Sequence, residues 1–122
     1  MYFFEGFEAK EQKLIKAGTG KILETDEAGT EVEVLTALKE PMMESLLYRV
    51  APGAGRNENI SHEGEEFIHV ISGMLEIWLD ETERYVVENG GSFCFKSTQQ
   101  HRWRNIGDNE LRVLWVSTPP TF

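Results

Sequence analysis

Histidine and carboxylate side chains gather in one short segment of the sequence, Ser61–Gly73, which reads SHEGEEFIHVISG. Side chains of an extended chain point alternately to its two faces. If Ile68 and Val70 face the interior of the protein, His62 and Glu66 share that face. An imidazole and a carboxylate would then point together into an apolar interior, where an ionised carboxylate needs a metal ion or a hydrogen-bonding partner.

A second segment, HRWRN at residues 101–105, can bring another histidine to the same place. Its two arginines belong in water, so the alternation turns His101 and Trp103 inward. Two imidazoles and one carboxylate suit a divalent metal such as iron, zinc, nickel or manganese, and three protein ligands leave open positions on it. The sequence therefore predicts a metal site formed by His62, Glu66 and His101.

Short strands are the elements that must carry these side chains. Apolar or alternating runs recur about every ten residues between Gly, Asn, Asp and Pro turns, which is typical of an antiparallel all-β sandwich or barrel. We expect the barrel domain at residues 21–122, after a lead-in or docking segment at 1–20 with a possible short helix near 8–17. The expected strands are 31–38, 45–50, 65–72, 74–80, 84–87, 92–96, 101–105 and 111–118.

The composition is that of a single globular domain with an acidic surface. The chain has 122 residues and a net charge of −9, which disfavours direct binding to nucleic acid. No apolar stretch is long enough to cross a membrane, and the N-terminus lacks the features of a signal peptide. The single cysteine, Cys94, lies between two phenylalanines. It fits a cytoplasmic location and is interpreted as a small buried apolar side chain.

The first histidine segment resembles the first sequence motif of the cupin family. His62, Glu66 and Gly73 match the second half of that motif in type and spacing, whereas Ile60 stands where the motif has its first histidine. With the second segment, the resemblance covers roughly residues 44–118. It implies an antiparallel jelly-roll barrel of the cupin type, also called a double-stranded β-helix.

The second segment resembles the second cupin motif. Gly90, His101 and Asn105 match it in spacing, whereas Lys96 and Thr98 replace its proline and inner glycine. Cupin metals are usually held by three histidines and one glutamate, so the resemblance implies a metal site reduced to two histidines and one glutamate. That ligand set holds non-haem iron in many oxygenases.

The sequence is also similar to the C-terminal cupin domains of bacterial regulators that begin with an XRE-type helix-turn-helix. The segments SHEGEEF, HRWRN and STPPTF carry this likeness. It implies a sensor domain that binds a small-molecule ligand, forms a homodimer and leaves DNA binding to another domain. Tyr48, Trp103 and Asn105 are the candidate ligand-binding residues, with Arg49 as the open alternative to Tyr48 on the same strand. Asn105 is expected to hydrogen-bond backbone groups rather than to ligate a metal.

Two other functions stay open at this point. The same architecture occurs in phosphonate epoxidases, so the chain could be a small metalloenzyme of oxygenase or isomerase type that uses the two-histidine, one-glutamate site. Alternatively, the replacement of the first motif histidine by Ile60 could mark a cupin that has lost its site and only dimerises.

Overall fold

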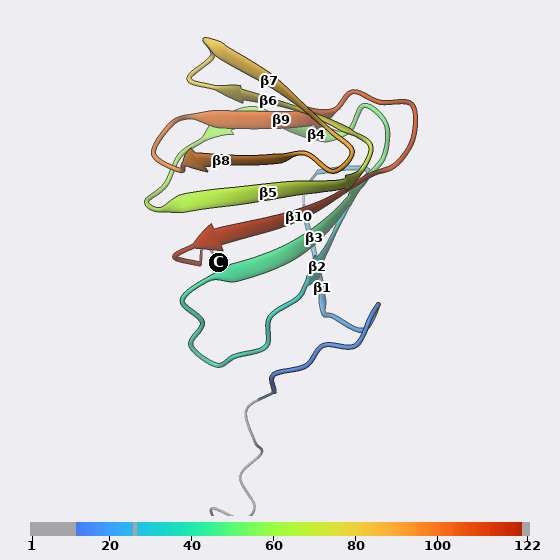
Figure 1. Ribbon diagram of the computed structural model, residues 1–122, viewed down its shortest axis with the longest axis vertical. Helices are drawn as coiled ribbons and strands as arrows, with labels where there is room; N and C mark the ends of the chain where they lie inside the picture. The colour runs from blue at the N-terminus through green and yellow to red at the C-terminus, as the bar shows by residue number, and fades with distance from the viewer. Residues whose placement is uncertain (1–11, 26, 121–122) are drawn as a thin grey trace, which may run out of the picture.

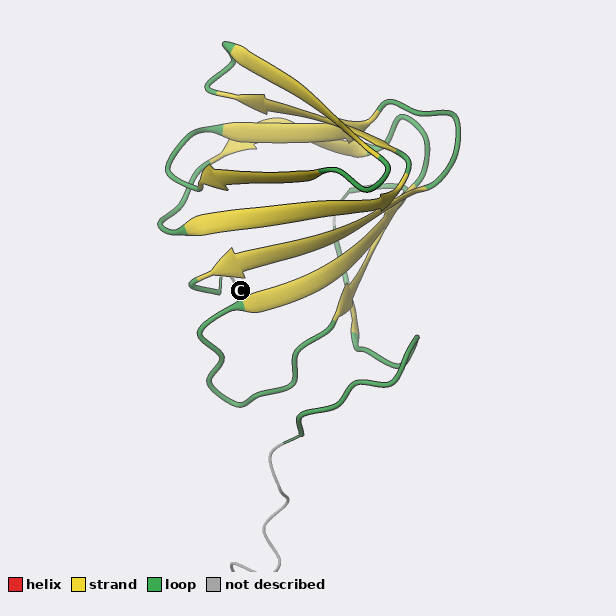
Figure 2. Cartoon of the chain, viewed as in Figure 1, coloured by secondary structure: helices red, strands yellow, loops and turns green. Residues whose placement is uncertain are grey.

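The structure is a computed structural model that describes residues 12–25 and 27–120, and all regular structure in this part of the chain is β-strand (Figure 2). The all-β class predicted from the sequence is confirmed. None of the described residues forms a helix that could span a membrane. The strands are β1 (Ile22–Leu23), β2 (Thr30–Val34), β3 (Glu44–Val50), β4 (Gly55–Ile60), β5 (Glu65–Ser72), β6 (Met74–Leu79), β7 (Glu83–Glu88), β8 (Ser92–Lys96), β9 (His101–Asn105) and β10 (Leu111–Thr118).

Two antiparallel sheets pack against each other and enclose the core (Figure 1). The larger sheet has the order β1-β2-β3-β10-β5-β8, and the smaller has the order β4-β9-β6-β7. Burying one such apolar side chain contributes about 1.5–3 kcal/mol, so this shared core holds the two sheets in fixed positions relative to each other. The fully buried apolar side chains come from both sheets and are Val50, Ile68, Val70, Leu75, Ile77, Leu111 and Val113.

Strand β5 follows the alternation expected from the sequence. Glu66, Ile68 and Val70 are buried on its inner face. Glu65 points outward, where it is exposed and forms an ion pair with Lys96 on the neighbouring strand β8. The apolar residues of β5 therefore fix which of its two adjacent glutamates enters the barrel.

The structure differs from the sequence-based expectation in several places. The sequence does not predict β4, because GRNENI has no apolar alternation and its place in the sheet comes from pairing with β9. Strand β2 ends at Val34, earlier than expected, and Cys94 on β8 is exposed rather than buried. Residues 12–17 are not helical, and the rest of the helix expected near 8–17 lies in residues 1–11, outside the described residues.

Candidate metal centre

The three predicted ligands come together inside the barrel. His62 lies in the loop that leads into β5, Glu66 lies on β5, and His101 begins β9, so both sheets contribute. Nε2 of His62 and Nε2 of His101 lie 3.1 Å and 3.2 Å from Oε2 of Glu66, and all three ligand atoms lie within 4.8 Å of one another. Two ligands at right angles on a metal with bonds of about 2.1 Å are about 3.0 Å apart, so the spacing suits a metal ion.

Backbone hydrogen bonds hold the loop that carries His62. The amide of His62 donates to the carbonyl of Ser97, and the amide of Ser97 donates to the carbonyl of Gly64, each at 2.9 Å. Gly64 has a φ of +112°, and a Cβ at this position would collide with the carbonyl oxygen of Thr118. A glycine is therefore required here for the chain to turn tightly enough to bring His62 and Glu66 to one centre.

Each imidazole is oriented by a backbone carbonyl on its other ring nitrogen. Nδ1 of His101 lies 2.7 Å from the carbonyl oxygen of Gln99, and Nδ1 of His62 lies 3.1 Å from that of Glu63. Because a carbonyl only accepts hydrogen bonds, Nδ1 carries the proton in each neutral ring, and the lone pair is left on Nε2, beside Glu66. A hydrogen bond of this kind behind the ligating nitrogen is a regular feature of histidine metal ligands.

Glu66 is almost completely buried, with 4% of its surface exposed. Its Oε1 accepts a hydrogen bond from Nε1 of Trp115 at 2.6 Å, whereas its Oε2 has no donor among the described residues while both imidazoles are neutral. A buried carboxylate oxygen without a donor is costly. A metal ion bound by Oε2 and the two Nε2 atoms would satisfy it, so the residues present fit a divalent metal.

Protonation of His101 is the other way to satisfy Oε2. Burial raises the pKa of Glu66, but hydrogen bonds from His101 and Trp115 outweigh burial and lower it below its usual value. Burial lowers the pKa of His101, but the hydrogen bonds to Glu66 and to the Gln99 carbonyl, together with the charge of Glu66, outweigh burial and raise it. Both shifts keep Glu66 ionised, so the carboxylate is available to a metal ion that displaces the proton from His101.

The three residues line an internal cavity of about 90 Å³. Tyr48 and Trp103, two of the candidate ligand contacts, also line it, and the Tyr48 ring packs against Trp103 and Trp115 with centroid distances of 5.6 Å and 5.1 Å. Burial and the nearby carboxylates raise the pKa of Tyr48, so its hydroxyl stays protonated and can donate a hydrogen bond. The remaining lining residues are Glu27, Glu44, Leu46, Arg56, Ile60, Trp115 and Ser117.

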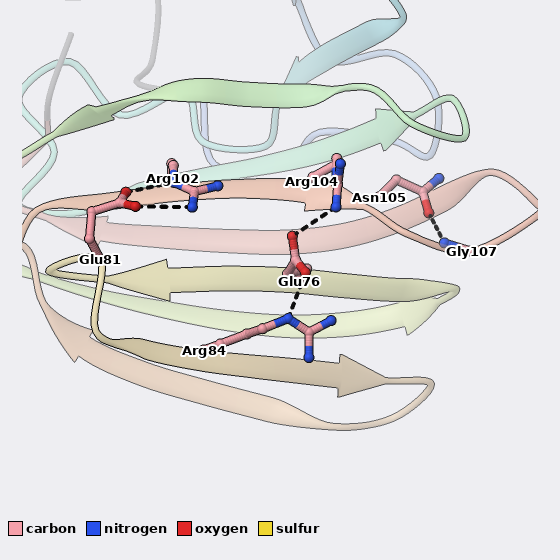
Figure 3. Close-up of polar contacts among 7 residues, drawn as sticks. All are labelled: Glu76, Glu81, Arg84, Arg102, Arg104, Asn105 and Gly107. Carbon is pink, nitrogen blue, oxygen red and sulfur yellow. Dashed lines mark hydrogen bonds and ion pairs between the residues drawn. The ribbon is translucent and has the colours of Figure 1, made fainter.

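The outer face of β9 explains why His101 turns inward. Arg102 donates two hydrogen bonds to Glu81 at 2.6 Å and 3.1 Å, and Arg104 donates to Glu76 at 3.3 Å (Figure 3). These ion pairs hold the arginines on the outside of the sheet. Alternation along the strand then places His101 on the inside, as the sequence predicts.

Asn105, the third candidate ligand contact, is buried but does not line this cavity. Its amide nitrogen donates to the carbonyls of Val50 and Asn109 at 2.9 Å each, and its oxygen accepts from the amide of Gly107 at 2.8 Å; Figure 3 draws the last of these bonds. All of these partners are backbone groups. Asn105, at the end of β9, therefore holds the turn between β9 and β10, and the structure does not bring it to the metal ligands.

Sequence reasoning missed several groups of the cavity wall. Trp115 and Ser117 follow the two-residue spacing of the buried Leu111 and Val113 on β10, and that spacing alone can place both inside the barrel. Glu44 begins β3. Glu27 lies between strands and Arg56 lies on the unpredicted β4, so no periodic signal in the sequence points to them.

Comparison with known proteins identifies the family. The sequence profile of the family described as Cupin domain matches residues 46–117, which is more than half of the chain. The chain belongs to the cupin family. The expected antiparallel jelly-roll barrel of the cupin type is therefore confirmed.

This cupin is similar in sequence to curated proteins of Streptomyces. It is 32% identical over 68 residues to "Polyketide synthase CurC" of Streptomyces cyaneus, covering 56% of this chain and 44% of that protein. The chain spans about half the length of the curated relatives it matches.

Among solved structures it resembles the polyketide cyclase RemF from Streptomyces resistomycificus, with a TM-score of 0.73, 18% identity, and coverage of 89% of this chain and 80% of that one. It also resembles the Cupin_2 domain of an XRE family transcriptional regulator from Enterobacter cloacae. That match has a TM-score of 0.65, 23% identity, and coverage of 76% of this chain and 99% of that domain. At these identities the structural likeness establishes the fold alone.

Proposed function

We propose that this cupin binds a divalent metal ion through His62, Glu66 and His101 and holds a small molecule beside it. The observation that carries the proposal is the buried Oε2 of Glu66, which lacks a hydrogen-bond donor among the described residues and lies beside two imidazole nitrogens. Nitrogen and carboxylate ligands suit iron, zinc, nickel or manganese. Such a metal, when bound, polarises an oxygen atom of the molecule it holds.

The protein's own residues would orient that molecule. The Tyr48 hydroxyl offers a hydrogen-bond donor, and the aromatic rings of Trp103 and Trp115 form a wall against which a flat molecule can pack.

In the use that we propose first, ligand occupancy is sensed and passed to a DNA-binding partner domain in a cytoplasmic, homodimeric regulator. The structural likeness to the cupin domain of the XRE family regulator supports this use. The second candidate is a small metalloenzyme. The similarity to CurC, a polyketide synthase, and to RemF, a polyketide cyclase, favours it.

Elemental mass spectrometry of untagged protein tests the metal site. We expect near-stoichiometric metal in the wild type and its loss in His101→Ala. The matched control is His69→Ala, because His69 lies on the outer side of β5, where its Nδ1 contacts the Ser92 hydroxyl, and its removal should leave the metal content unchanged. Absence of metal from the wild type, even after loading, would refute the proposed metal site.

Incubation of the metal-loaded protein with a bacterial metabolite extract separates the two uses. A sensor retains a metabolite in stoichiometric amount without depleting it, whereas an enzyme depletes one metabolite and accumulates another over time. The His101→Ala variant is the control for either result. Bound iron in the preceding experiment would favour the enzyme.

A further inference from the structure

The metal cavity is too small to hold a metabolite by itself. Its volume of about 90 Å³ corresponds to roughly three water molecules at about 30 Å³ each. A larger hollow of about 490 Å³ lies next to it, lined by Glu27, Ala28, Gly55, Arg56, Asn57 and Glu58. Glu27 and Arg56 line both spaces, so this pair forms the wall between them.

Glu27 and Arg56 are joined by one weak contact. A terminal nitrogen of Arg56, Nη1, lies 3.2 Å from Oε2 of Glu27, and the two side chains are 32% and 22% exposed. The Nε of Arg56 is buried and has no hydrogen-bond partner in the part of the chain that the structure describes. Nε and the adjacent Nη2 form the edge of a guanidinium that binds a carboxylate through two parallel hydrogen bonds.

We propose that Arg56 makes this site selective for a small organic carboxylate. This inference rests on the proposed metal site and adds the class of ligand. The carboxylate of the ligand accepts hydrogen bonds from Nε and Nη2 of Arg56, and Glu27 keeps its contact with Nη1 of the same guanidinium. The rest of the ligand then extends from the outer hollow toward His62, Glu66 and His101.

The hydrogen-bond donor of the wall, rather than its net charge, points to a carboxylate, because Glu27, Glu44 and Glu58 line the two hollows beside the single guanidinium of Arg56. An amine cannot accept the hydrogen bond that the buried Nε of Arg56 offers, and it would meet the positive charges of Arg56 and of the bound metal. A dianion such as phosphate would meet the carboxylates of Glu27 and Glu44, which line the same cavity. A single carboxylate satisfies the buried Nε of Arg56 and adds only one negative charge to this wall.

Binding of pyruvate and its neutral analogue pyruvamide to Co²⁺-loaded protein tests the inference, by calorimetry and by the visible spectrum of the cobalt. We expect the wild type to prefer pyruvate by about tenfold or more, the range of a charged hydrogen bond. Arg56→Met should abolish the preference and leave Co²⁺ affinity unchanged. Glu27→Gln should tighten pyruvate binding several-fold, because it removes a negative charge beside the bound carboxylate. Glu88→Gln is the matched control, because Glu88 is an exposed glutamate at the end of β7 that lines neither hollow, and it should behave as the wild type.

Three other outcomes would overturn either this inference or the proposed metal site beneath it. Equal pyruvate affinity in the wild type and in Arg56→Met, or tighter binding of an amine such as alaninamide, overturns the inference while Co²⁺ binding leaves the metal site standing. If Arg56→Met does not fold, the Glu27→Gln variant decides, because unchanged or weaker pyruvate binding there also overturns it. Failure of the wild type to bind Co²⁺ overturns the proposed metal site and this inference with it.

Discussion

Replacement of Trp115 by phenylalanine should weaken metal binding although Trp115 is not a ligand. Nε1 of Trp115 donates to Oε1 of Glu66 at 2.6 Å, and both side chains are about 95% buried. Phenylalanine keeps an aromatic ring but removes this donor. Oε1 would then be a buried carboxylate oxygen that lacks its partner, and the Glu66 side chain would lose the contact that holds its orientation.

The size of the effect follows from that one bond. A hydrogen bond to a charged group contributes about 1.5–3 kcal/mol, and loss of a group that orients a metal ligand typically costs about 10- to 100-fold in metal affinity. We therefore expect the dissociation constant for Zn²⁺ or Co²⁺ to rise at least about tenfold in Trp115→Phe. Competition titration with a chelator measures it, and urea unfolding of the metal-free protein reports any loss of stability separately.

The matched control is Trp103→Phe. Trp103 is equally buried, lines the same cavity and packs against the same tyrosine, Tyr48, but among the described residues its indole does not donate to Glu66. Both variants lose the same ring volume, so the packing cost is shared. If both weaken metal binding equally, the effect comes from packing, and the reasoning about the Trp115–Glu66 hydrogen bond is wrong.

Two further predictions concern groups away from the metal ligands. Hydrogen bonds from the Arg49 guanidinium and from the Gly20 amide lower the pKa of the buried Glu33 below 4.5. Ionised Glu33 therefore stabilises the fold at pH values above its unfolded pKa. This contribution disappears as the pH falls through the lower pKa of the folded state. Urea unfolding should show Glu33→Gln less stable than the wild type by about 1–3 kcal/mol near neutral pH. This difference should shrink as the pH falls through the lowered pKa of Glu33, and a difference that stays constant would contradict the assignment. Asn105→Ala removes the donor that the carbonyls of Val50 and Asn109 share, and it should lower the free energy of unfolding by about 2–4 kcal/mol. Metal affinity should stay unchanged. Weaker metal binding in a folded variant would instead place Asn105 in the site.

The positions of the metal ligands follow from short-range rules that the sequence contains. Alternation along β5 separates Glu65 from Glu66, and alternation along β9 separates His101 from the arginines on either side of Trp103. These rules work because apolar residues within the same strand fix the face that is buried. The meeting of β5 and β9 at one centre is not a short-range property. The resemblance to the two cupin motifs predicted it.

The second half of the site follows from no local pattern. Strand β4 lacks apolar alternation, so pairing with β9 determines its place in the sheet and the position of Arg56 in the cavity wall. Glu27 reaches the same wall from a loop. The donor role of Trp115 also depends on the register that places Ser117 opposite Glu66 and Trp115 opposite Ile68, which only the assembled sheet defines.

Ile60 provides the strongest argument for a cupin without a working site, and the structure shows how the site can work around it. Ile60 lines the cavity and is the cross-strand neighbour of His101, so an apolar side chain occupies the position that the cupin motif gives to a histidine. A site that only dimerises would have no need to orient the remaining ligands. Here His62, His101 and Glu66 each keep a dedicated partner, two backbone carbonyls and the indole of Trp115. The loss of one ligand at an otherwise supported centre leaves one more open position for a bound molecule, which suits a ligand-binding or catalytic metal better than a closed structural one.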